Sequence, residues 1–438
     1  MDEEINWVVN AMATHKIAHL VTSDRGGAAS AAIRLHEGLL KSGQDSVLLV
    51  LHKYSCVERC YPVKIPVYKK WLFRVKNKIQ FTRYKDTLHA NKYFFRLHEN
   101  LYSLSIKDIL KSLPFVPEFF VVHWITGFID FLQLYDLQIA TGATIVFNHL
   151  DMSLITGGCH YSFGCTGYEV DCAACPAIQN SAIKNSASEQ LKARKKYFPL
   201  KSISIVPSTL LDAQTAKSTL FRNTVSQKLL IGLDPKLYLP KDKKALREKY
   251  GIALSKRVVL FGAETIHDER KGFVYLKKAL EELSAEISQQ KRTEVVLVLI
   301  GKQSMGDPGF ENISFEHIIV PYANSSEQLI EYYQLSDFFV CPSVEDAGPM
   351  MINEAMMCGL PVLAFDNGVA RDLITEQTGC IVELKNVREL SAAIGRFASM
   401  EDEEIHFFQL AARKNALQCI DIEHHVRKFT IVMDQIAE

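Results

Sequence analysis

Short apolar runs recur along both halves of the chain, and stretches with a helical spacing of apolar residues separate them. Such runs are typical of strands that are buried on both faces of a parallel sheet. We expect strands at residues 18–22, 46–51, 119–123 and 145–148 in the first half, and at 258–261, 295–300 and 337–341 in the second. Strands that alternate with helices predict parallel sheets with helices on both faces, so we expect an α/β fold of two doubly wound domains.

The periodic pattern breaks at residues 228–245, where Gly232 and Pro235 precede a lysine cluster. Glycine and proline mark linkers because they interrupt both helices and strands. A chain of 438 residues also exceeds the usual size of one hydrophobic core. We therefore expect an N-terminal domain at residues 1–235 and a C-terminal domain at 236–438, with the last helix crossing back to the N-terminal domain.

The composition gives the chain no net charge. Lys plus Arg and Asp plus Glu number 50 each, so we expect no binding of nucleic acid. The first residues, MDEEINWVVN, are acidic and lack the basic start of a signal peptide, and no apolar run approaches the length that spans a bilayer. We therefore expect a cytoplasmic protein. Its ten cysteines then fit reduced thiols or metal ligands.

The most specific chemistry lies in the segment CPSVEDAGPMMINEAMMCGLP, which begins at the end of the last expected strand. Gly348 and Pro349 supply a turn and the first helical position, directly ahead of Met350, and the free N–H groups and positive end of this helix favour an anion. Carboxylates repel phosphate, so Glu345 and Glu354 suit the neutral hydroxyls of a sugar or ribose. A surface loop followed by a helix with a solvated Glu354 is the alternative.

This segment resembles the donor-binding motif of the retaining family 4 glycosyltransferases. The matching positions are Pro342, Ser343, Glu345, Glu354, Ala355, Cys358, Gly359, Pro361 and Val362, followed by Ala364, Phe365, Asp366, Gly368, Asp372, Thr378 and Gly379. Eight residues separate the two glutamates, one more than the commonest family spacing, as in a branch similar to exopolysaccharide and colanic-acid transferases. The resemblance implies a GT-B fold, in which two Rossmann-like domains face a central cleft.

The same resemblance implies a function and roles for the two glutamates. Enzymes of this family move a sugar from a nucleotide-sugar donor, a UDP- or GDP-sugar, to an acceptor with retention of the anomeric configuration. The implied acceptor here is a saccharide, linked to a polyprenyl lipid, in surface polysaccharide biosynthesis. Glu345 would contact the donor sugar and Glu354 the ribose. The alternative from a different class is a nucleotide-sugar binding or scaffolding protein with the same fold and little turnover.

Two further segments face the donor phosphates in this resemblance. Arg270 and Lys271 precede Gly272 at a helix start, where two cations and free N–H groups suit a diphosphate leaving group. The resemblance assigns Lys271 directly, whereas Arg270 substitutes for an arginine that the family carries earlier. Gly26 and Gly27 permit a close approach of the backbone, either to the phosphates or to a packed strand. Because cations carry the phosphate charge, we expect no cofactor to be required for catalysis.

Three polar residues are candidates for the acceptor side of the cleft. His123 ends an expected strand, at the edge where open α/β sheets bind ligands. Similar enzymes have a His-Trp at this point, which implies an acceptor contact. His149 and Asp151 follow the next strand, and Leu150 separates them here, whereas relatives often place His and Asp next to each other. A buried, structural imidazole is the alternative for His123.

Cys159, Cys165, Cys172 and Cys175 fall within seventeen residues of a loop at 156–178, and the last pair has the Cys-x2-Cys spacing. Four thiolates at such spacings match a closed, tetrahedral zinc site. Reduced, buried thiols and a pair of disulfides are the alternatives, and an iron–sulfur cluster ranks below them. Any zinc here would be structural, because four thiolates leave no open coordination position.

Residues 61–96 are rich in lysine, arginine and aromatic residues and contain one acidic residue. Within them Val67, Trp71, Val75 and Ile79 repeat every four residues and form an apolar helical stripe flanked by cations. This pattern suits an anionic membrane surface, which would place the protein peripherally on the inner face of the cytoplasmic membrane. A basic helix whose stripe packs on its own domain is the alternative.

Overall fold

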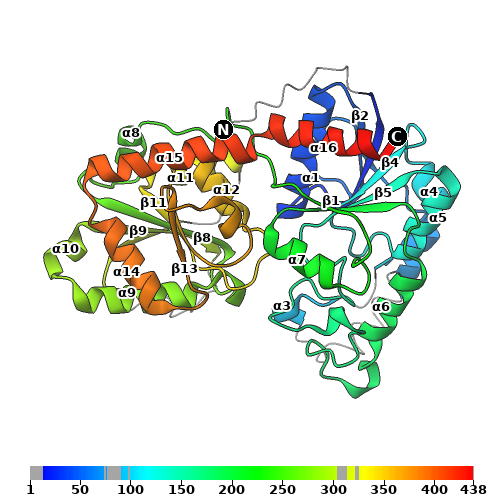
Figure 1. Cartoon of the computed structure of the whole chain (residues 1–438), viewed down its shortest axis with the longest axis horizontal. Coiled ribbons are helices and arrows are strands. Elements are labelled where there is room, and N and C mark those ends of the chain that lie inside the picture. Colours follow the sequence, from blue (N-terminus) through cyan, green and yellow to red (C-terminus); the bar gives the residue numbers. More distant parts are fainter. Residues whose placement is uncertain are drawn as a thin grey trace, which may run out of the picture.

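The chain folds into two α/β domains that lie side by side, with the N-terminal domain on the right in Figure 1. A computed structural model describes residues 13–73, 75, 90–96, 99–302, 313–320 and 325–437. Most of the second half of the basic segment therefore lies outside the described residues.

The N-terminal domain is built on a seven-stranded parallel sheet with the order β3-β2-β1-β4-β5-β6-β7. Its strands are β1 (Lys16–Ser23), β2 (Asp45–His52), β3 (Cys60–Pro62), β4 (Phe119–Val122), β5 (Thr144–Asn148), β6 (Ser202–Val206) and β7 (Ser226–Lys228). Its helices are α1 (Gly27–Lys41), α3 (Ala90–Tyr93), α4 (Ile106–Leu110), α5 (Phe131–Thr141), α6 (Ser186–Lys196) and α7 (Thr209–Lys217). The central strands are buried along almost their whole length, as expected when helices cover both faces of a sheet.

The C-terminal domain repeats this plan with a six-stranded parallel sheet of order β10-β9-β8-β11-β12-β13. Its strands are β8 (Arg257–Thr265), β9 (Val295–Lys302), β10 (Glu316–Val320), β11 (Phe338–Cys341), β12 (Val362–Phe365) and β13 (Gly379–Val382). Its helices are α8 (Lys243–Lys249), α9 (Phe273–Glu286), α10 (Gln289–Thr293), α11 (Ser326–Leu335), α12 (Met350–Met357), α13 (Ala370–Leu373), α14 (Val387–Ala398) and α15 (Asp402–Ile420). Two doubly wound parallel sheets confirm the fold class that the alternating pattern predicts.

In both sheets the strand order changes direction between two central strands, β1 and β4 in the first and β8 and β11 in the second. Open parallel sheets bind ligands beyond the carboxyl ends of such strands. Gly26 follows β1 and His123 follows β4, while Arg270 and Lys271 follow β8 and Glu345 follows β11. The candidates from the two domains therefore emerge at the two positions where this fold binds ligands.

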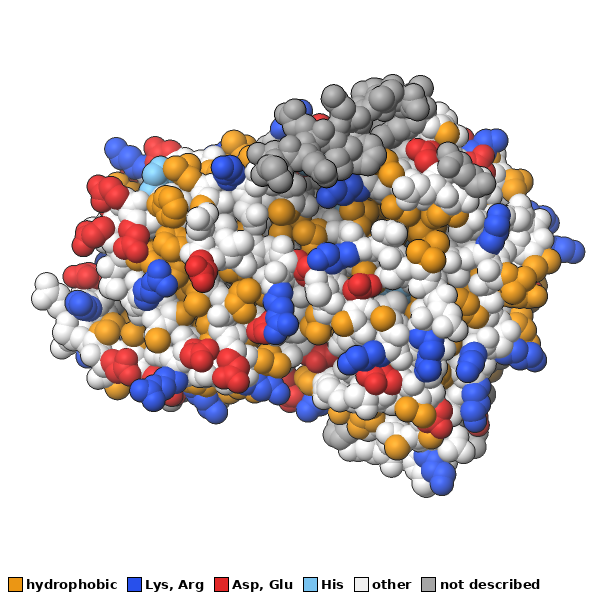
Figure 2. All heavy atoms as spheres, viewed as in Figure 1, with side chains coloured by type: hydrophobic (Ala, Val, Ile, Leu, Met, Phe, Trp, Pro, Cys, Tyr) orange, Lys and Arg blue, Asp and Glu red, His pale blue; other side chains and the backbone are white. Residues whose placement is uncertain are grey.

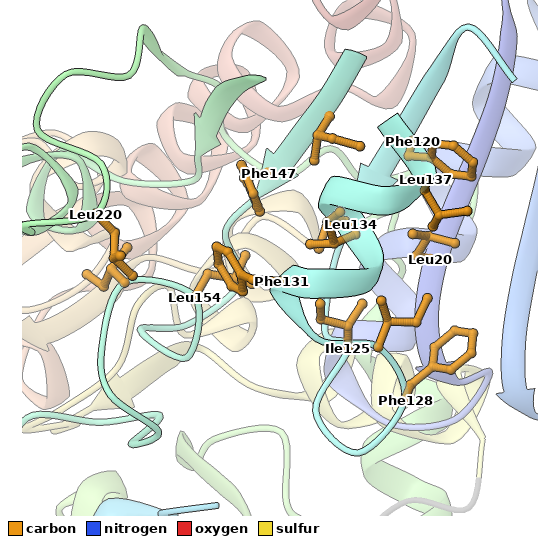
Figure 3. Packing of buried hydrophobic residues seen from close by; sticks show 14 of the residues in the cluster. Leu20, Phe120, Ile125, Phe128, Phe131, Leu134, Leu137, Phe147, Leu154 and Leu220 are labelled. Atoms are coloured by element: carbon orange, nitrogen blue, oxygen red, sulfur yellow. The ribbon is translucent and has the colours of Figure 1, made fainter. Parts of the chain in front are cut away.

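Helix α5 illustrates how local sequence sets the layers. Its start is a capping box, in which the Asp130 side chain accepts from the N–H of Gln133, and it ends at Gly142 with a φ of 74°. Between these ends Leu134 and Leu137, spaced to lie on one face, point into the sheet (Figure 3). Each fully buried leucine contributes about 1.5–3 kcal/mol, so this packing fixes the strands beneath.

The chain crosses between the domains twice. The second crossing is made by the last helix, α16 (Ile422–Ala437), which returns to lie along α1 (Figure 1). Val426 and Phe429 of α16 pack with Leu35 of α1 in one hydrophobic cluster. A bridge between Leu233 and Asp421 joins the two crossing segments. The C-terminal helix is therefore part of the N-terminal core.

Acidic and basic side chains are intermixed over both domains on the face that Figure 2 displays, in keeping with their equal numbers. Any attraction for a charged ligand must therefore come from local groups. Within the described part of the chain, no helix combines the length and apolar character needed to cross a membrane.

Candidate functional site

Backbone contacts fix the segment after β8 against the loop after β11. The N–H of Val344 donates to the carbonyl of Arg270 at 2.8 Å. Gly272 has a φ of +71°, and a Cβ at this position would lie 1.7 Å from the carbonyl oxygen of Pro342. Only glycine fits so close an approach. Lys271 is therefore held directly beside the residues that follow β11.

Lys271 forms an ion pair with Asp346, with 2.5 Å between Nζ and Oδ2. The other carboxylate oxygen of Asp346 accepts from the N–H of Gly348 at 3.2 Å. Burial acts to raise the pKa of Asp346, but Lys271, Arg270 and the Gly348 N–H outweigh burial and lower this pKa. Burial acts to lower the pKa of Lys271, and Asp346 outweighs it, so this pKa is raised. Both groups stay charged at neutral pH.

Arg270 reaches the N-terminal domain. Its guanidinium carbon lies 3.8 Å from the centre of the Tyr161 ring, and the guanidinium also pairs with Asp268. A cation over an aromatic face stabilises the pair by about 0.5–2 kcal/mol. Burial raises the pKa of Tyr161, and the opposing charge of Arg270 does not cancel that effect, so the phenol is neutral. This contact joins the two domains at the cation-bearing segment.

Glu345 is also held by the N-terminal domain. Its Oε1 accepts from the N–H of Ser162 at 2.9 Å, and the Ser162 hydroxyl lies 3.4 Å from the same oxygen. Burial raises the pKa of Glu345, while the N–H groups of Ser162 and Phe163 act against this rise. The carboxylate predicted to bind a sugar hydroxyl is therefore already engaged by a hydrogen-bond donor from the N-terminal domain.

Glu354 lies on α12 and is only 6% exposed, which excludes the alternative of a solvated carboxylate. Its Oε2 accepts from the Tyr333 hydroxyl at 3.0 Å. Its Oε1 lies 3.4 Å from both the Tyr238 hydroxyl and a guanidinium nitrogen of Arg34, which comes from α1 of the other domain. Burial raises the pKa of Glu354, and Arg34 and the two tyrosines oppose the rise.

Helices α1 and α12 both begin without a side-chain cap. Helix α12 starts at Met350, after Gly348 and Pro349, and α1 starts at Gly27, after Gly26. A Cβ added at Gly26 or Gly27 would meet no atom within 4 Å, so these glycines are not needed for close packing of helix on strand. The uncapped N–H groups and positive ends of both helices suit an anion.

Asp151 pairs with His160 rather than with His149. One oxygen of Asp151 lies 2.7 Å from Nδ1 of His160. Burial acts to raise the pKa of Asp151, and His160 outweighs burial and lowers it. The same loop continues into Tyr161 and Ser162, which contact the C-terminal domain. His160 was not among the predicted site residues, although it lies within the cysteine-rich loop at 156–178.

His123 and His149 are buried inside the N-terminal domain, with 1% and 0% of their surfaces exposed. Nε2 of His123 lies 2.9 Å from Nδ1 of His19, and its other ring nitrogen lies 3.1 Å from Nδ2 of Asn148. Nε2 of His149 lies 3.1 Å from the Ser204 hydroxyl. Burial lowers the pKa of each ring to about 3, so both are neutral. This burial fits the structural alternative for His123, and the acceptor contacts of both rings stay predictions.

The cysteine-rich loop contains Tyr161 and Ser162, which contact the C-terminal domain. Cys159, Cys165, Cys172 and Cys175 are free thiols, and all four line one small cavity together with Ser162. None of the four forms a disulfide in the structure, so the disulfide alternative is not realised here. The loop thus links the cysteine cluster directly to Glu345 through Ser162.

The described part of the basic segment forms a helix over residues 67–73. The predicted apolar stripe faces solvent, because Val67, Trp71 and Val75 are 83%, 62% and 41% exposed. The fourth residue of the stripe, Ile79, lies outside the described residues. At these three positions the stripe is therefore exposed rather than packed on its own domain.

A cavity of about 1340 Å³ lies away from these groups, near the amino ends of the C-terminal strands. There Lys243 and Arg247 each lie 2.7 Å from a carboxylate oxygen of the buried Asp337. The lining contains neither Lys271 nor Glu345. The position of the candidate groups, rather than the volume of this cavity, defines the functional site.

Residues 242–414 match the family described as glycosyl transferases group 1, and they include Lys271, Glu345 and Glu354. TuaC of Bacillus subtilis, named as a glycosyltransferase of teichuronic acid biosynthesis, is 24% identical over 216 residues, which cover 49% of this chain and 50% of that protein. The chain spans about half the length of the curated relatives it matches.

Solved structures match nearly the whole chain. Sucrose-phosphate synthase from Thermosynechococcus elongatus superimposes with a TM-score of 0.64 at 16% identity, over 96% of this chain and 99% of that one. HepE from Anabaena, solved in complex with UDP and glucose, gives a TM-score of 0.61 at 14% identity over 96% and 99% of the two chains. Identities this low show the fold alone. The chain therefore has the GT-B fold, and residues 242–414 of its C-terminal domain match the glycosyl transferases group 1 family.

Proposed function

We propose that the chain is a retaining glycosyltransferase that moves a sugar from a nucleotide-sugar donor to a saccharide acceptor. The observation that carries this proposal is the convergence of Lys271, Arg270 and the uncapped start of α12 at one sheet edge, beside Glu345 and Glu354. Cations and N–H groups suit a diphosphate, and carboxylates suit hydroxyls. The assignment of retention rests on the resemblance of the donor segment to family 4.

The leaving diphosphate gains negative charge as the bond from the sugar to the phosphate breaks. Lys271 and Arg270 would carry that charge, so the chain's own cations perform this task without an added cofactor. Asp346 holds the Lys271 ammonium in place, and an ammonium has three protons, so further donors remain for a phosphate oxygen. One preorganised group of this kind typically contributes about 3 kcal/mol to the rate.

The two glutamates would orient the donor through its hydroxyls. An ionised carboxylate has about four acceptor positions. Ser162 therefore leaves Glu345 able to accept from a hydroxyl of the donor sugar. Glu354 would accept from the ribose, beside the hydroxyls of Tyr333 and Tyr238. Precise placement of this kind lowers the barrier by removing freedom from the reacting groups.

Asp151 and His160 would act on the acceptor side by positioning the loop that meets the donor site. His160 lies within hydrogen-bond distance of Asp151, Trp124 and Thr126, which fixes its ring. Tyr161 follows it directly and stacks on Arg270. The position of this loop would therefore depend on the pairing of His160 with Asp151.

Comparisons with known proteins support a choice of donor and acceptor to test first. HepE is described in complex with UDP and with UDP-glucose, which supports a UDP-sugar as the donor, with GDP-sugars as the comparison. The name of TuaC refers to teichuronic acid biosynthesis, which supports a role in making a surface polysaccharide. We propose that the acceptor is a saccharide linked to a polyprenyl lipid.

Contact with an anionic membrane surface is part of this proposal. Trp71 and Val67 are exposed on the helix at residues 67–73. The opposite side of this helix is anchored, because Phe73 lies 4.4 Å from the Tyr102 ring, centre to centre, and Lys69 pairs with Asp108 at 2.7 Å. An anchored helix with exposed aromatic and apolar residues and nearby lysines suits a lipid surface that holds the acceptor.

Transfer is tested with purified protein and a panel of UDP- and GDP-sugars, first by thermal stabilisation. A donor at one hundred times its dissociation constant adds about 2.7 kcal/mol. Product formation and the anomeric configuration of the new bond are then followed by NMR with the stabilising donor and a polyprenyl-linked saccharide. We expect Lys271→Met to abolish most turnover, and Lys278→Met, an exposed lysine on α9, to leave it unchanged.

The outcomes separate the two classes of function. Donor binding with transfer supports an enzyme, and inversion at the anomeric carbon would refute retention. Donor binding without hydrolysis or transfer in any acceptor trial would leave the nucleotide-sugar binding or scaffolding alternative, which the occupied Glu345 and the buried His149 favour. Absence of any stabilising nucleotide-sugar would refute both.

Membrane contact is tested by sedimentation with vesicles. We expect binding to vesicles that contain anionic lipid and weak binding to zwitterionic ones. Trp71→Ala should reduce binding, whereas Leu254→Ala, which removes a residue 56% exposed on the C-terminal domain, should not. Equal loss in both variants, or equal binding to both vesicle types, would contradict the proposal.

A further inference from the structure

Four thiols from the loop at 156–178 surround one enclosed space. Cys159, Cys165, Cys172 and Cys175 line a cavity of about 20 Å³. A space of roughly 10–15 Å³ holds one water molecule, so this cavity has room for a single small species. The four sulfurs share this space although the outermost cysteines are separated by fifteen residues of chain.

One of the four sulfurs already accepts a hydrogen bond. The N–H of Gly167 donates to Sγ of Cys165 at 3.4 Å. A donor of this kind favours a thiolate over a thiol, because the thiolate is the stronger acceptor.

The backbone of the loop is bent to bring the thiols inward. Cys172 has a φ of +55°, which is uncommon for a residue with a side chain. A Cβ at Gly157 would lie 3.1 Å from Cβ of Cys172 and 2.3 Å from the carbonyl oxygen of Ala187, so only glycine permits this approach. Strained residues of this kind persist where the surrounding structure requires them.

We propose that Cys159, Cys165, Cys172 and Cys175 bind one zinc ion, and that this ion fixes the loop that bridges the cleft. In the described part of the chain no group of three or more His, Cys, Asp or Glu side chains is yet arranged to hold a metal ion. Binding would therefore rotate the four thiols into the shared cavity and complete a tetrahedron. The site would be closed, so the ion would have a structural role.

The position of the cluster gives the ion a consequence for the cleft. Cys159 is followed by His160, Tyr161 and Ser162, whose contacts reach Asp151, Arg270 and Glu345 respectively. Ser162 itself lines the cysteine cavity. A zinc ion bound by the four cysteines would fix one side of the segment His160–Ser162 and so hold the three contacts of this segment in place.

The first test measures metal in the wild-type protein, purified without chelator. We expect close to one zinc per chain, and Cys159, Cys165, Cys172 and Cys175 should react with an alkylating reagent faster once a chelator removes the ion. Replacement of zinc by cobalt should give the strong charge-transfer absorption of a tetrahedral four-thiolate site. Metal-free protein in which a chelator does not change the reactivity of these four thiols, two disulfides among them, or iron in place of zinc would overturn the proposal.

The second test uses variants. Cys172→Ser combined with Cys175→Ser should lose the zinc, whereas Cys56→Ser, at an exposed cysteine, should keep it. Local hydrogen exchange should rise around 156–178 in the double variant while the C-terminal domain keeps its protection. If the double variant does not fold, the wild-type metal content and the cobalt spectrum still decide the question. Neither readout depends on transferase activity, so failure of the proposed function leaves this test intact.

Discussion

Lys271 and Asp346 allow the catalytic role of a cation to be separated from its contribution to stability. Lys271→Met removes both the ion pair and the charge proposed to act on the leaving diphosphate. Asp346→Asn removes the ion pair but keeps the cation, and the new amide oxygen still accepts from the N–H of Gly348. The two variants should therefore resemble each other in stability and differ in turnover.

The structure sets the expected size of both effects. Removal of one partner from a buried ion pair costs about 3–5 kcal/mol. The side chains of Lys271 and Asp346 are 26% and 13% exposed, and Asp346 keeps the Gly348 N–H and the nearby Arg270 charge. We therefore expect each variant to lose about 2 kcal/mol of stability, below the fully buried value. Only Lys271→Met should also lose about 3 kcal/mol of transition-state stabilisation, roughly 100-fold in kcat.

The assay combines urea unfolding with release of nucleoside diphosphate during transfer, measured at a temperature where all variants are folded. Lys278→Met serves as the control for loss of a lysine from the same helical region. Proportional loss of stability and of kcat in both variants would show that the ion pair is only structural. An unchanged kcat in Lys271→Met would remove this residue from the mechanism.

Two further predictions follow from the same region. Gly272→Ala should destabilise the C-terminal domain by more than about 1 kcal/mol in urea unfolding, because φ at this position is +71° and the new Cβ meets the Pro342 carbonyl oxygen. Gly251→Ala is the control, since Gly251 has a φ of +68° but open space around it, and this variant should lose less stability. The pKa of Asp346 in the folded protein lies below its unfolded value of about 3.9, so the contribution of Asp346 to stability is present above that pH and is lost as the pH falls through the folded pKa. The urea midpoint should therefore fall less steeply with decreasing pH in Asp346→Asn than in the wild type. The same pH dependence in both proteins would contradict this.

The central strands could be predicted from the sequence because they are continuous apolar runs. Strands β1, β2, β4, β5, β8, β9 and β11 coincide closely with the expected ranges. The short outer strands β3 and β7 were missed, since each has three residues and only partial burial. Strands β12 and β13 lie within the segment that resembled a known motif, where apolar residues were interpreted as motif positions rather than as strands.

The candidate site was predictable only where a motif lies within one segment. Glu345, Glu354 and Lys271 were assigned to the candidate site in this way, but the residues that they contact were not predicted. Ser162 is separated from Glu345 by 183 residues, and Arg34 from Glu354 by 320. No local pattern marks such pairs, because packing of the two domains against each other creates them. The burial of His123 could not be predicted for a related reason: the end of a strand predicts the position of a residue, whereas its burial depends on what covers it.

Arg34 gives a direct test of whether the two domains share the donor site. Its guanidinium lies 3.4 Å from Oε1 of Glu354, and its Nη1 is buried with no hydrogen-bond partner in the described structure. A buried N–H group without a hydrogen-bond partner lowers the stability of the protein. An oxygen atom of the bound nucleotide-sugar would accept a hydrogen bond from this group.

Arg34→Met should therefore weaken donor binding, measured as the dissociation constant, without loss of the fold. It should also raise the pKa of Glu354, because the charge of Arg34 acts to lower that pKa. Loss of donor binding on acidification should then begin at a higher pH than in the wild type. Arg34→Lys keeps the charge and should restore the pH at which binding is lost, though with weaker affinity, since an ammonium cannot supply both guanidinium contacts. Arg388→Met, at an exposed position on α14, is the matched control. Unchanged affinity and pH dependence in Arg34→Met would mean that the N-terminal domain takes no part in binding the donor at Glu354.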